Sequence, residues 1–353
     1  MKRKYILPAF LIIQIILLQL LSFFPEVVER FYSNGLYVWI SNSMRFVLGK
    51  IPFSVGDICY LIAIYFIIKW FWNQRKSWKL DWKNNLLQII SVFSIGYFCF
   101  HLFWGINYYR VPLFEKMNIS KDYSDADLLN FTKKLITKTN AIQYQITKND
   151  SLKVKFPYSK EQVFNENLNG FQLLATIYPY FNYSNPSIKK SLISLPLTYM
   201  GFGGYLNPFT NEAQVNYLGP MYNFPTTTCH EMAHQLGYAS ESEANFIGFL
   251  ASVKNKNTYF QYSGYSFALR YCLHYWFVRD ETVLKQLLKT IHPGILENYK
   301  ESELFWKKYE TFIDTGFRLF YDQFLKMNQQ KEGIESYSRF VDLMVNYYKD
   351  KAL

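Results

Sequence analysis

Residues Thr228–Gly237 read Thr-Cys-His-Glu-Met-Ala-His-Gln-Leu-Gly. The histidines His230 and His234 are four positions apart, so on a helix they lie on one face. Pro225 and the threonines after it form a helix start signal, and the apolar residues inside the segment would form a buried face. The segment therefore predicts a helix, about Thr226–Leu236, that presents two imidazoles side by side.

The same segment contains the pattern His-Glu-x-x-His. Two imidazoles on one helical face can reach a single Zn²⁺ ion, and Glu231 projects beside them to activate water. In a chain with 5 His and 16 Glu, the expected number of chance matches is about 0.003. The pattern predicts a zinc site with His230 and His234 as ligands and Glu231 as the catalytic base. The alternative is a structural histidine pair in a buried helix.

A catalytic zinc site needs a third protein ligand and one open position. The next histidine is His274, forty residues after His234, so the nearby carboxylates are the better candidates. Gly237 can end the first helix and Ser240 can begin a second one, about Glu241–Val253. The start of the second helix would then return beside the end of the first.

This pattern resembles the gluzincin metallopeptidases, in which the third ligand is a Glu on the helix after the His-Glu-x-x-His helix. The resemblance implies that Glu241 is the ligand. It also implies that Asn245, in Glu241-Ser-Glu-Ala-Asn245, supports a zinc-binding histidine. Glu243 is the competing candidate, and its other role would be the second half of a capping box with Ser240.

Three N-terminal segments are long and apolar: Tyr5–Phe24, Phe53–Trp72 and Leu86–Tyr109. About twenty apolar residues cross a bilayer core, so each segment is expected to span a membrane. The first is too long for a cleavable signal peptide and is expected to remain as an anchor. The amphipathic segment Val28–Leu48 is expected to lie at the membrane interface.

Half of the residues are hydrophobic, which excludes a disordered chain.

The distribution of charge predicts the orientation of the chain in the membrane. The net charge is +11, and residues 1–110 hold +8 of it (12 basic and 4 acidic), which argues against a nucleic-acid-binding face. The N-terminus and the loop around Lys79 carry basic clusters and should be cytoplasmic. We therefore expect a membrane domain over 1–110 and an extracytoplasmic domain over 111–353.

The C-terminal part is expected to be mostly helical. Short strands are predicted only in the Gly- and Pro-rich stretch before the motif, at Ser191–Tyr199, Gly204–Phe209 and Ala213–Leu218. The last two could offer an edge strand to an extended substrate or could merely cover the motif helix. The predicted helices are Asp125–Thr147, Ser159–Tyr178, Thr226–Leu236, Glu241–Val253, Tyr259–Val278, Glu281–Ile291, Glu297–Asn328 and Ile334–Lys349.

One further group could steady an oxyanion. His274 is the expected oxyanion or proton donor, and Tyr271 and Tyr275 on the same predicted helix are further candidates.

Nearly the whole chain resembles a family of uncharacterised bacterial integral-membrane proteins with an His-Glu-x-x-His domain. The resemblance rests on the three spans, Pro52–Asp57, Asn207–Thr210, Cys229–Gly237 and Glu241–Asn245. It implies a mainly α fold, in which three transmembrane helices precede a helical zincin-like (α+β) domain with a small β-hairpin or sheet next to the motif helix. It supports the zinc site and implies no substrate.

The expected function is that of a zinc metallopeptidase anchored in the bacterial cytoplasmic membrane. Its partners would be the lipid bilayer and a peptide or protein substrate, with no nucleic acid. The alternative is a non-catalytic membrane sensor or interaction protein with a structural or vestigial zinc site. Cleavage within the membrane is disfavoured, because Thr226–Gln235 is too short and too polar at its flanks to be a span.

Overall fold

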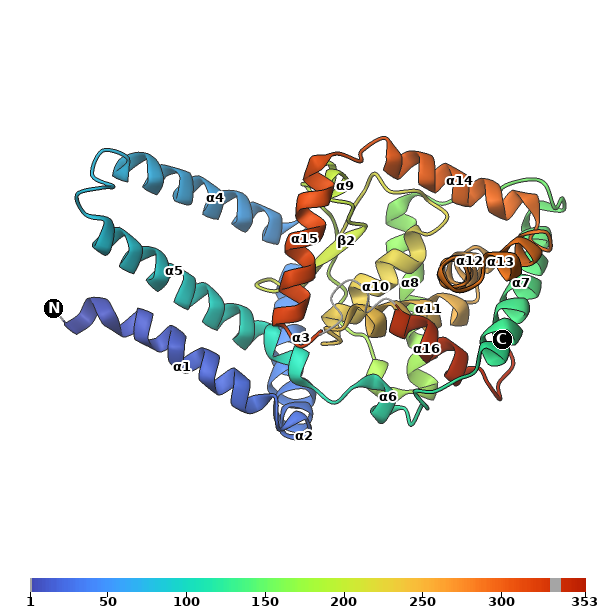
Figure 1. Ribbon diagram of the computed structural model, residues 1–353, viewed down its shortest axis with the longest axis horizontal. Helices are drawn as coiled ribbons and strands as arrows, with labels where there is room; N and C mark the ends of the chain where they lie inside the picture. The colour runs from blue at the N-terminus through green and yellow to red at the C-terminus, as the bar shows by residue number, and fades with distance from the viewer. Residues whose placement is uncertain (1, 331–337) are drawn as a thin grey trace.

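The computed structural model describes residues 2–330 and 338–353. It is mainly helical, with 70% helix and 3% strand. Figure 1 shows an arm of long N-terminal helices that projects from a rounded helical body. The arm consists of the short 3-10 turn η1 (Lys2–Tyr5), α1 (Ile6–Leu21), α4 (Val55–Gln74) and α5 (Trp82–Phe103).

Two helices of the arm, α4 and α5, are long and apolar enough to cross a membrane. The shorter α1 reaches that length only together with the following segment, Pro25–Leu48, which bends away from it by 100°. This segment comprises α2 (Pro25–Val27), the π-helical η2 (Val28–Leu36) and α3 (Tyr37–Leu48). The chain therefore has two candidate spans, or three if the bent pair counts as one.

The third predicted span is shorter than expected. It was predicted to run to Tyr109, but α5 ends at Phe103 and the 3-10 helix η3 (Gly105–Tyr109) follows. The backbone leaves the helical region at Trp104, where φ is −157°. The carbonyl of Trp104 then accepts a hydrogen bond from the Asn107 side chain, which closes the turn. The interruption points this end of the arm into the body.

A buried carboxylate joins the first turn of α4 to the body. Glu212 accepts hydrogen bonds from the backbone N–H groups of Val55 (3.2 Å) and Gly56 (2.6 Å). A negative charge is favourable at a helix N-terminus because the peptide dipoles point their positive ends there. Thr210 also donates to Glu212, at 2.9 Å. Two segments far apart in sequence, Pro52–Asp57 and Asn207–Thr210, thereby meet at one carboxylate.

A three-stranded sheet lies in the body, in the order β1-β3-β2. β1 (Ile188–Lys190) runs parallel to β3 (Glu212–Val215), and β2 (Gly204–Asn207) runs antiparallel to β3. The prediction of a strand at Ser191–Tyr199 is wrong, because Ser194–Tyr199 form the helix α9. Pro196 lacks the N–H that a strand ladder requires, but a proline fits the first turn of a helix.

The helix α11 (Glu241–Lys254) lies at the centre of the body, and every residue from Glu241 to Val253 is buried. The prediction for Asp125–Thr147 is confirmed by α7, and its Ser124 capping box is formed. The prediction of one helix at Glu297–Asn328 is wrong, since the chain breaks into two helices near Glu310. Ile334, the first residue of the last predicted helix, lies outside the described residues. The remaining elements are α6 (Leu113–Lys116), α8 (Lys160–Ile177), η4 (Pro179–Phe181), α10 (Phe224–Gln235), α12 (Thr258–Arg279), α13 (Glu281–Leu288), α14 (Pro293–Lys307), α15 (Phe312–Met327) and α16 (Ser338–Tyr347).

Candidate metal centre

The two motif histidines lie on α10, as their spacing predicts. Pro225 occupies the first turn, where its missing N–H costs nothing. The helix ends where Gly237 adopts φ +84°, a left-handed conformation that favours glycine. The Gly237 N–H donates to the His234 carbonyl at 2.9 Å, and the chain then turns into α11.

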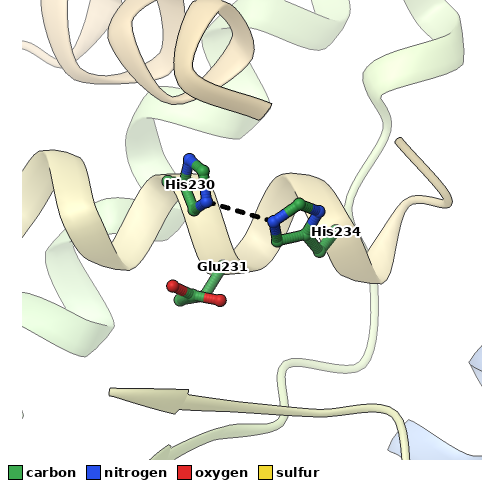
Figure 2. A group of neighbouring side chains, drawn as sticks. All are labelled: His230, Glu231 and His234. Carbon is green, nitrogen blue, oxygen red and sulfur yellow. Dashed lines mark hydrogen bonds between the residues drawn. The ribbon is translucent and has the colours of Figure 1, made fainter. Parts of the chain in front are cut away.

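The imidazoles of His230 and His234 face each other, with their Nε2 atoms 3.1 Å apart (Figure 2). The Nδ1 atom of His234 lies 2.7 Å from the Tyr238 carbonyl. It must donate its proton to that oxygen, so the lone pair of His234 is on Nε2, facing the other imidazole. Such an outer hydrogen bond fixes the tautomer of a metal-binding histidine.

Glu241, the first residue of α11, completes a group of three. One of its carboxylate oxygens lies 3.3 Å from Nε2 of His230, and the other lies 3.7 Å from Nε2 of His234. Tetrahedral zinc with bonds of 2.0–2.1 Å requires ligand atoms about 3.3 Å apart. The separations of 3.1, 3.3 and 3.7 Å, of which the last two go to different oxygens of Glu241, are close to this spacing.

Glu243, the competing candidate, has a different environment. Its carboxylate is buried and accepts a hydrogen bond of 2.6 Å from the backbone N–H of Leu113. Burial raises the pKa of Glu243, while Leu113 and the cation Arg110 oppose that rise. The alternative role of Glu243, a capping box with Ser240, is not formed, since the Ser240 side chain makes no cap hydrogen bond. The structure thus brings Glu241, and not Glu243, to both imidazoles.

Asn245 lies one turn after Glu241 and is buried. It contributes to raising the pKa of His230, but neither the Nδ1 atom of His230 nor the Nδ2 atom of Asn245 has a hydrogen-bond partner among the described residues. It also interacts with the phenol of Tyr271 on α12. On the other side of the group, the Tyr321 hydroxyl of α15 donates to Glu241 at 2.5 Å.

Glu231 projects between α10 and the sheet (Figure 2), and one of its carboxylate oxygens lies within 4.8 Å of a ring nitrogen of His230 and of His234. It is 3% exposed, and its Oε2 atom has no hydrogen-bond partner among the described residues. A Cβ atom on Gly204, the first residue of β2, would lie 2.7 Å from the Glu231 Oε1 atom. The absence of a side chain at Gly204 therefore makes room for this carboxylate at the edge strand.

Burial and charge give the four titratable groups different pKa values. Burial raises the pKa of Glu231 to about 8. Burial would lower the pKa of His230, but the carboxylates of Glu241 and Glu231 outweigh it and raise the value to about 8. Burial and the charge of His230 lower the pKa of His234 to about 4. For Glu241, hydrogen bonds and nearby histidines overcome burial and lower the pKa to about 2.

Side chains from the N-terminal third of the chain hold the end of α10. The indole of Trp104 donates to the His234 carbonyl at 3.1 Å, and the phenol of Tyr37 donates to the Gln235 carbonyl at 2.9 Å. Arg110 donates to the Gly237 carbonyl at 2.9 Å. Helix C-termini leave several carbonyls unpaired, and here the N-terminal third of the chain supplies the donors.

His274 lies apart from this group. It is exposed on α12, stacks on Phe277 and does not line the cavity described below. Tyr271, one turn earlier on the same helix, does line the cavity. No sequence pattern pointed to Tyr321 or Trp104 as site residues, because they are 80 or more residues away from the motif along the chain. Trp104 was predicted simply as part of an apolar span.

A cavity of about 700 Å³ opens beside the group. Among the described residues, His230, Glu231, His234 and Glu241 line it, together with Gly203–Leu206 of the edge-strand region. Much of the remaining lining consists of aromatic side chains, contributed by α4, α5, η3, α12, α14 and α15. The potential metal ligands are thus accessible from a space that also contacts the edge strand.

The chain belongs to the family described as protein of unknown function DUF3810, whose model matches residues 32–345. No curated protein and no solved structure matches the chain. The matched range contains α4, α5, α10 and α11 but not α1, so two candidate spans and the histidine pair lie within the family match.

Proposed function

We propose that this protein is a membrane-anchored zinc metallopeptidase that hydrolyses peptide bonds. His230, His234 and Glu241 hold the zinc ion, and Glu231 is the general base. The observation that carries the proposal is that the Nε2 atoms of His230 and His234 lie 3.1 Å apart, each with a Glu241 oxygen within 3.7 Å, and that the buried carboxylate of Glu231 lies beside them. Three protein ligands and an open cavity are typical of catalytic zinc sites, whereas structural sites have four protein ligands.

Zinc held by these residues supplies a Lewis acid that lowers the pKa of water and polarises a carbonyl. Glu231 takes the proton from the attacking water and later gives it to the departing amine. Its high pKa, about 8 in the absence of metal, comes from burial, and a nearby cation would lower it. A carboxylate in such a position can both accept and donate a proton near neutral pH.

The other residues orient these groups. The Tyr238 carbonyl fixes the tautomer of His234. Tyr271 lines the cavity, and burial followed by the charge of Glu241 raises the pKa of its phenol, so it stays protonated. A protonated phenol is a hydrogen-bond donor for a developing oxyanion. We therefore assign this role to Tyr271 in place of His274, which does not line the cavity.

The position of β2 at the edge of the sheet favours a peptide as the substrate. β2 pairs with β3 on one side, and no other described strand pairs with its outer edge. An extended peptide can add to such an edge through main-chain hydrogen bonds. Gly204 contacts the Glu231 carboxylate, so a peptide paired there would have a bond close to the base.

We also propose that the body lies outside the cytoplasm, at the outer face of the bacterial cytoplasmic membrane. The basic residues before α1 and between α4 and α5 favour a cytoplasmic location for both segments. With α1 as a span, everything after Arg110 is then extracytoplasmic.

The proposal is tested on the purified full-length chain in detergent micelles. The full chain is needed because Tyr37, Trp104 and Arg110 hold the end of α10. The probe is a random-sequence peptide library, and new amino termini are counted by mass spectrometry. We expect hydrolysis that stops when zinc is removed with a chelator and returns with added zinc. Hydrolysis that does not depend on zinc would contradict the proposal.

A second candidate function is a non-catalytic sensor in which zinc controls a conformation. The hydrogen bond from Tyr321 to Glu241 favours it, because this bond ties α15 to a metal-ligand candidate. Such a protein would bind zinc without hydrolysing the library, and the protection of its α15 from hydrogen exchange would differ between the zinc-bound and zinc-free forms.

A further inference from the structure

The cavity beside the histidine pair extends to the membrane side of the molecule. Tyr60 of α4 and Phe100 of α5 line it, and both helices are candidate spans. Trp104 and Tyr108, which follow α5, line the same wall. The part of the cavity lined by Tyr60, Phe100, Trp104 and Tyr108, here called the aromatic arm of the cavity, is therefore continuous with the helices that would cross the bilayer.

A second cavity, of about 520 Å³, adjoins the first and has a different character. Met200, Gly201, Phe202, Trp306 and Tyr321 line both cavities. The second one also carries charged side chains of both signs: Arg270, Glu303, Lys307, Glu310, Asp314 and Arg318. The combined space thus runs from the aromatic arm, beside α4 and α5, to the part lined by these charged side chains, here called the charged arm.

Helix α15 covers the junction between the two cavities. Figure 1 shows it running across the ends of the arm, at a large angle to α4 and α5. Phe324 contacts the ring of Phe100, with the ring centroids 6.1 Å apart. Other large apolar side chains of α15 are exposed, including Phe312 (85%) and Phe320 (62%). A helix with an exposed apolar face, lying across the ends of membrane spans, suits the bilayer interface.

We infer that the substrate is a polypeptide with an apolar membrane anchor, cleaved close to the bilayer surface. The anchor side of the scissile bond lies in the aromatic arm, and the polar side lies in the charged arm. This inference rests on the proposed peptidase function and deepens it by naming the substrate class. The continuity of the aromatic arm with α4 and α5 favours an anchored chain over a freely soluble peptide.

The test compares two forms of one probe on the same enzyme. The full-length chain is reconstituted in vesicles of phosphatidylcholine and phosphatidylglycerol. One probe is a random-sequence peptide library in which each peptide carries a palmitoyl chain at its amino end or its carboxyl end. The other probe is the same library without the palmitoyl chain. New amino termini are counted for both probes, with Glu231→Gln as the inactive reference.

The measured quantity is the ratio of the two hydrolysis rates. Wild type should favour the acylated library by about tenfold or more. Phe320→Ser should lower this ratio at least about threefold, because Phe320 is an apolar side chain that lines the cavity beside the histidine pair. Phe277→Ser is the matched control, since Phe277 is equally exposed at 62% but lies outside the cavity lining. Its ratio should equal that of wild type.

The outcomes separate this inference from the proposed function. Equal rates for the two libraries in wild type would overturn the inference and leave the peptidase proposal standing. A preference that Phe320→Ser does not change would also overturn the assignment of the aromatic arm. No hydrolysis above the Glu231→Gln reference would refute the peptidase proposal itself. Release of fatty acid from the vesicles, with both libraries intact, would identify a lipid substrate instead.

Discussion

The Oε2 atom of Glu241 and the Nε2 atom of His230 lie 3.3 Å apart, although the two residues belong to different helices. Glu243, two positions later, instead accepts the backbone N–H of Leu113 at 2.6 Å. The short turn between α10 and α11 therefore sends two neighbouring carboxylates to two different partners.

Zinc content should separate these two carboxylates. Glu241→Ala should lose zinc, because two remaining protein ligands rarely hold it. Glu243→Ala should keep zinc but lose about 1–3 kcal/mol of unfolding free energy, because the Leu113 N–H is left without its acceptor. Elemental analysis and thermal unfolding check both variants. If zinc is lost only in Glu243→Ala, then Glu243 is the ligand and the assignment of Glu241 is wrong.

Gly204 should control activity without affecting the metal. In Gly204→Ala, the new Cβ atom would lie 2.7 Å from the Glu231 Oε1 atom and from the Gln214 carbonyl. The Glu231 carboxylate must shift, and hydrolysis should fall by about tenfold to a hundredfold while zinc stays bound. Gly219→Ala is the control, since its nearest contact would be an ordinary 3.7 Å. Equal hydrolysis rates in the two variants would show that the position of Glu231 is unimportant.

The pH dependence of stability should reveal the buried carboxyl group of Glu231. Burial raises its pKa from 4.5 to about 8 in the folded chain without metal. The folded state therefore binds this proton more tightly, and the resulting stability is full below about pH 4.5 and lost as pH rises through about 8. In chelator, the melting temperature of Glu231→Gln should rise relative to wild type across this window, by several degrees. A constant difference would mean that Glu231 titrates normally.

Reporter fusions should give the orientation. A reporter that is active only outside the cytoplasm should be active when fused after Arg110. It should be inactive when fused near Lys79, in the basic loop between α4 and α5. Reversed signals would place the body in the cytoplasm and refute the proposed location.

Local patterns predicted much of the helical structure. The helical spacing of apolar residues was sufficient to predict α7 with its observed bounds, Asp125–Thr147. The spacing of His230 and His234 was sufficient to predict that both lie on one face of a helix. These features depend on residues within a few turns of each other, which a sequence displays directly.

Long-range contacts decided what the sequence could not show. Glu243 fits a local capping box, but the distant N–H of Leu113 takes its carboxylate instead. Ser191–Tyr199 has a strand-like composition, but Asp57 accepts the Ser191 hydroxyl and the Leu192 N–H, and a helix begins at Ser194. No spacing rule connects Tyr321 to Glu241, which are 80 residues apart.

The most direct test of the central claim compares zinc content and hydrolysis in one set of variants. Glu231→Gln should keep nearly one zinc per chain, while hydrolysis of the peptide library falls by orders of magnitude. His230→Ala and His234→Ala should lose both zinc and hydrolysis. If Glu231→Gln hydrolyses the library at the wild-type rate, or if both histidine variants keep their zinc, the zinc peptidase account is contradicted.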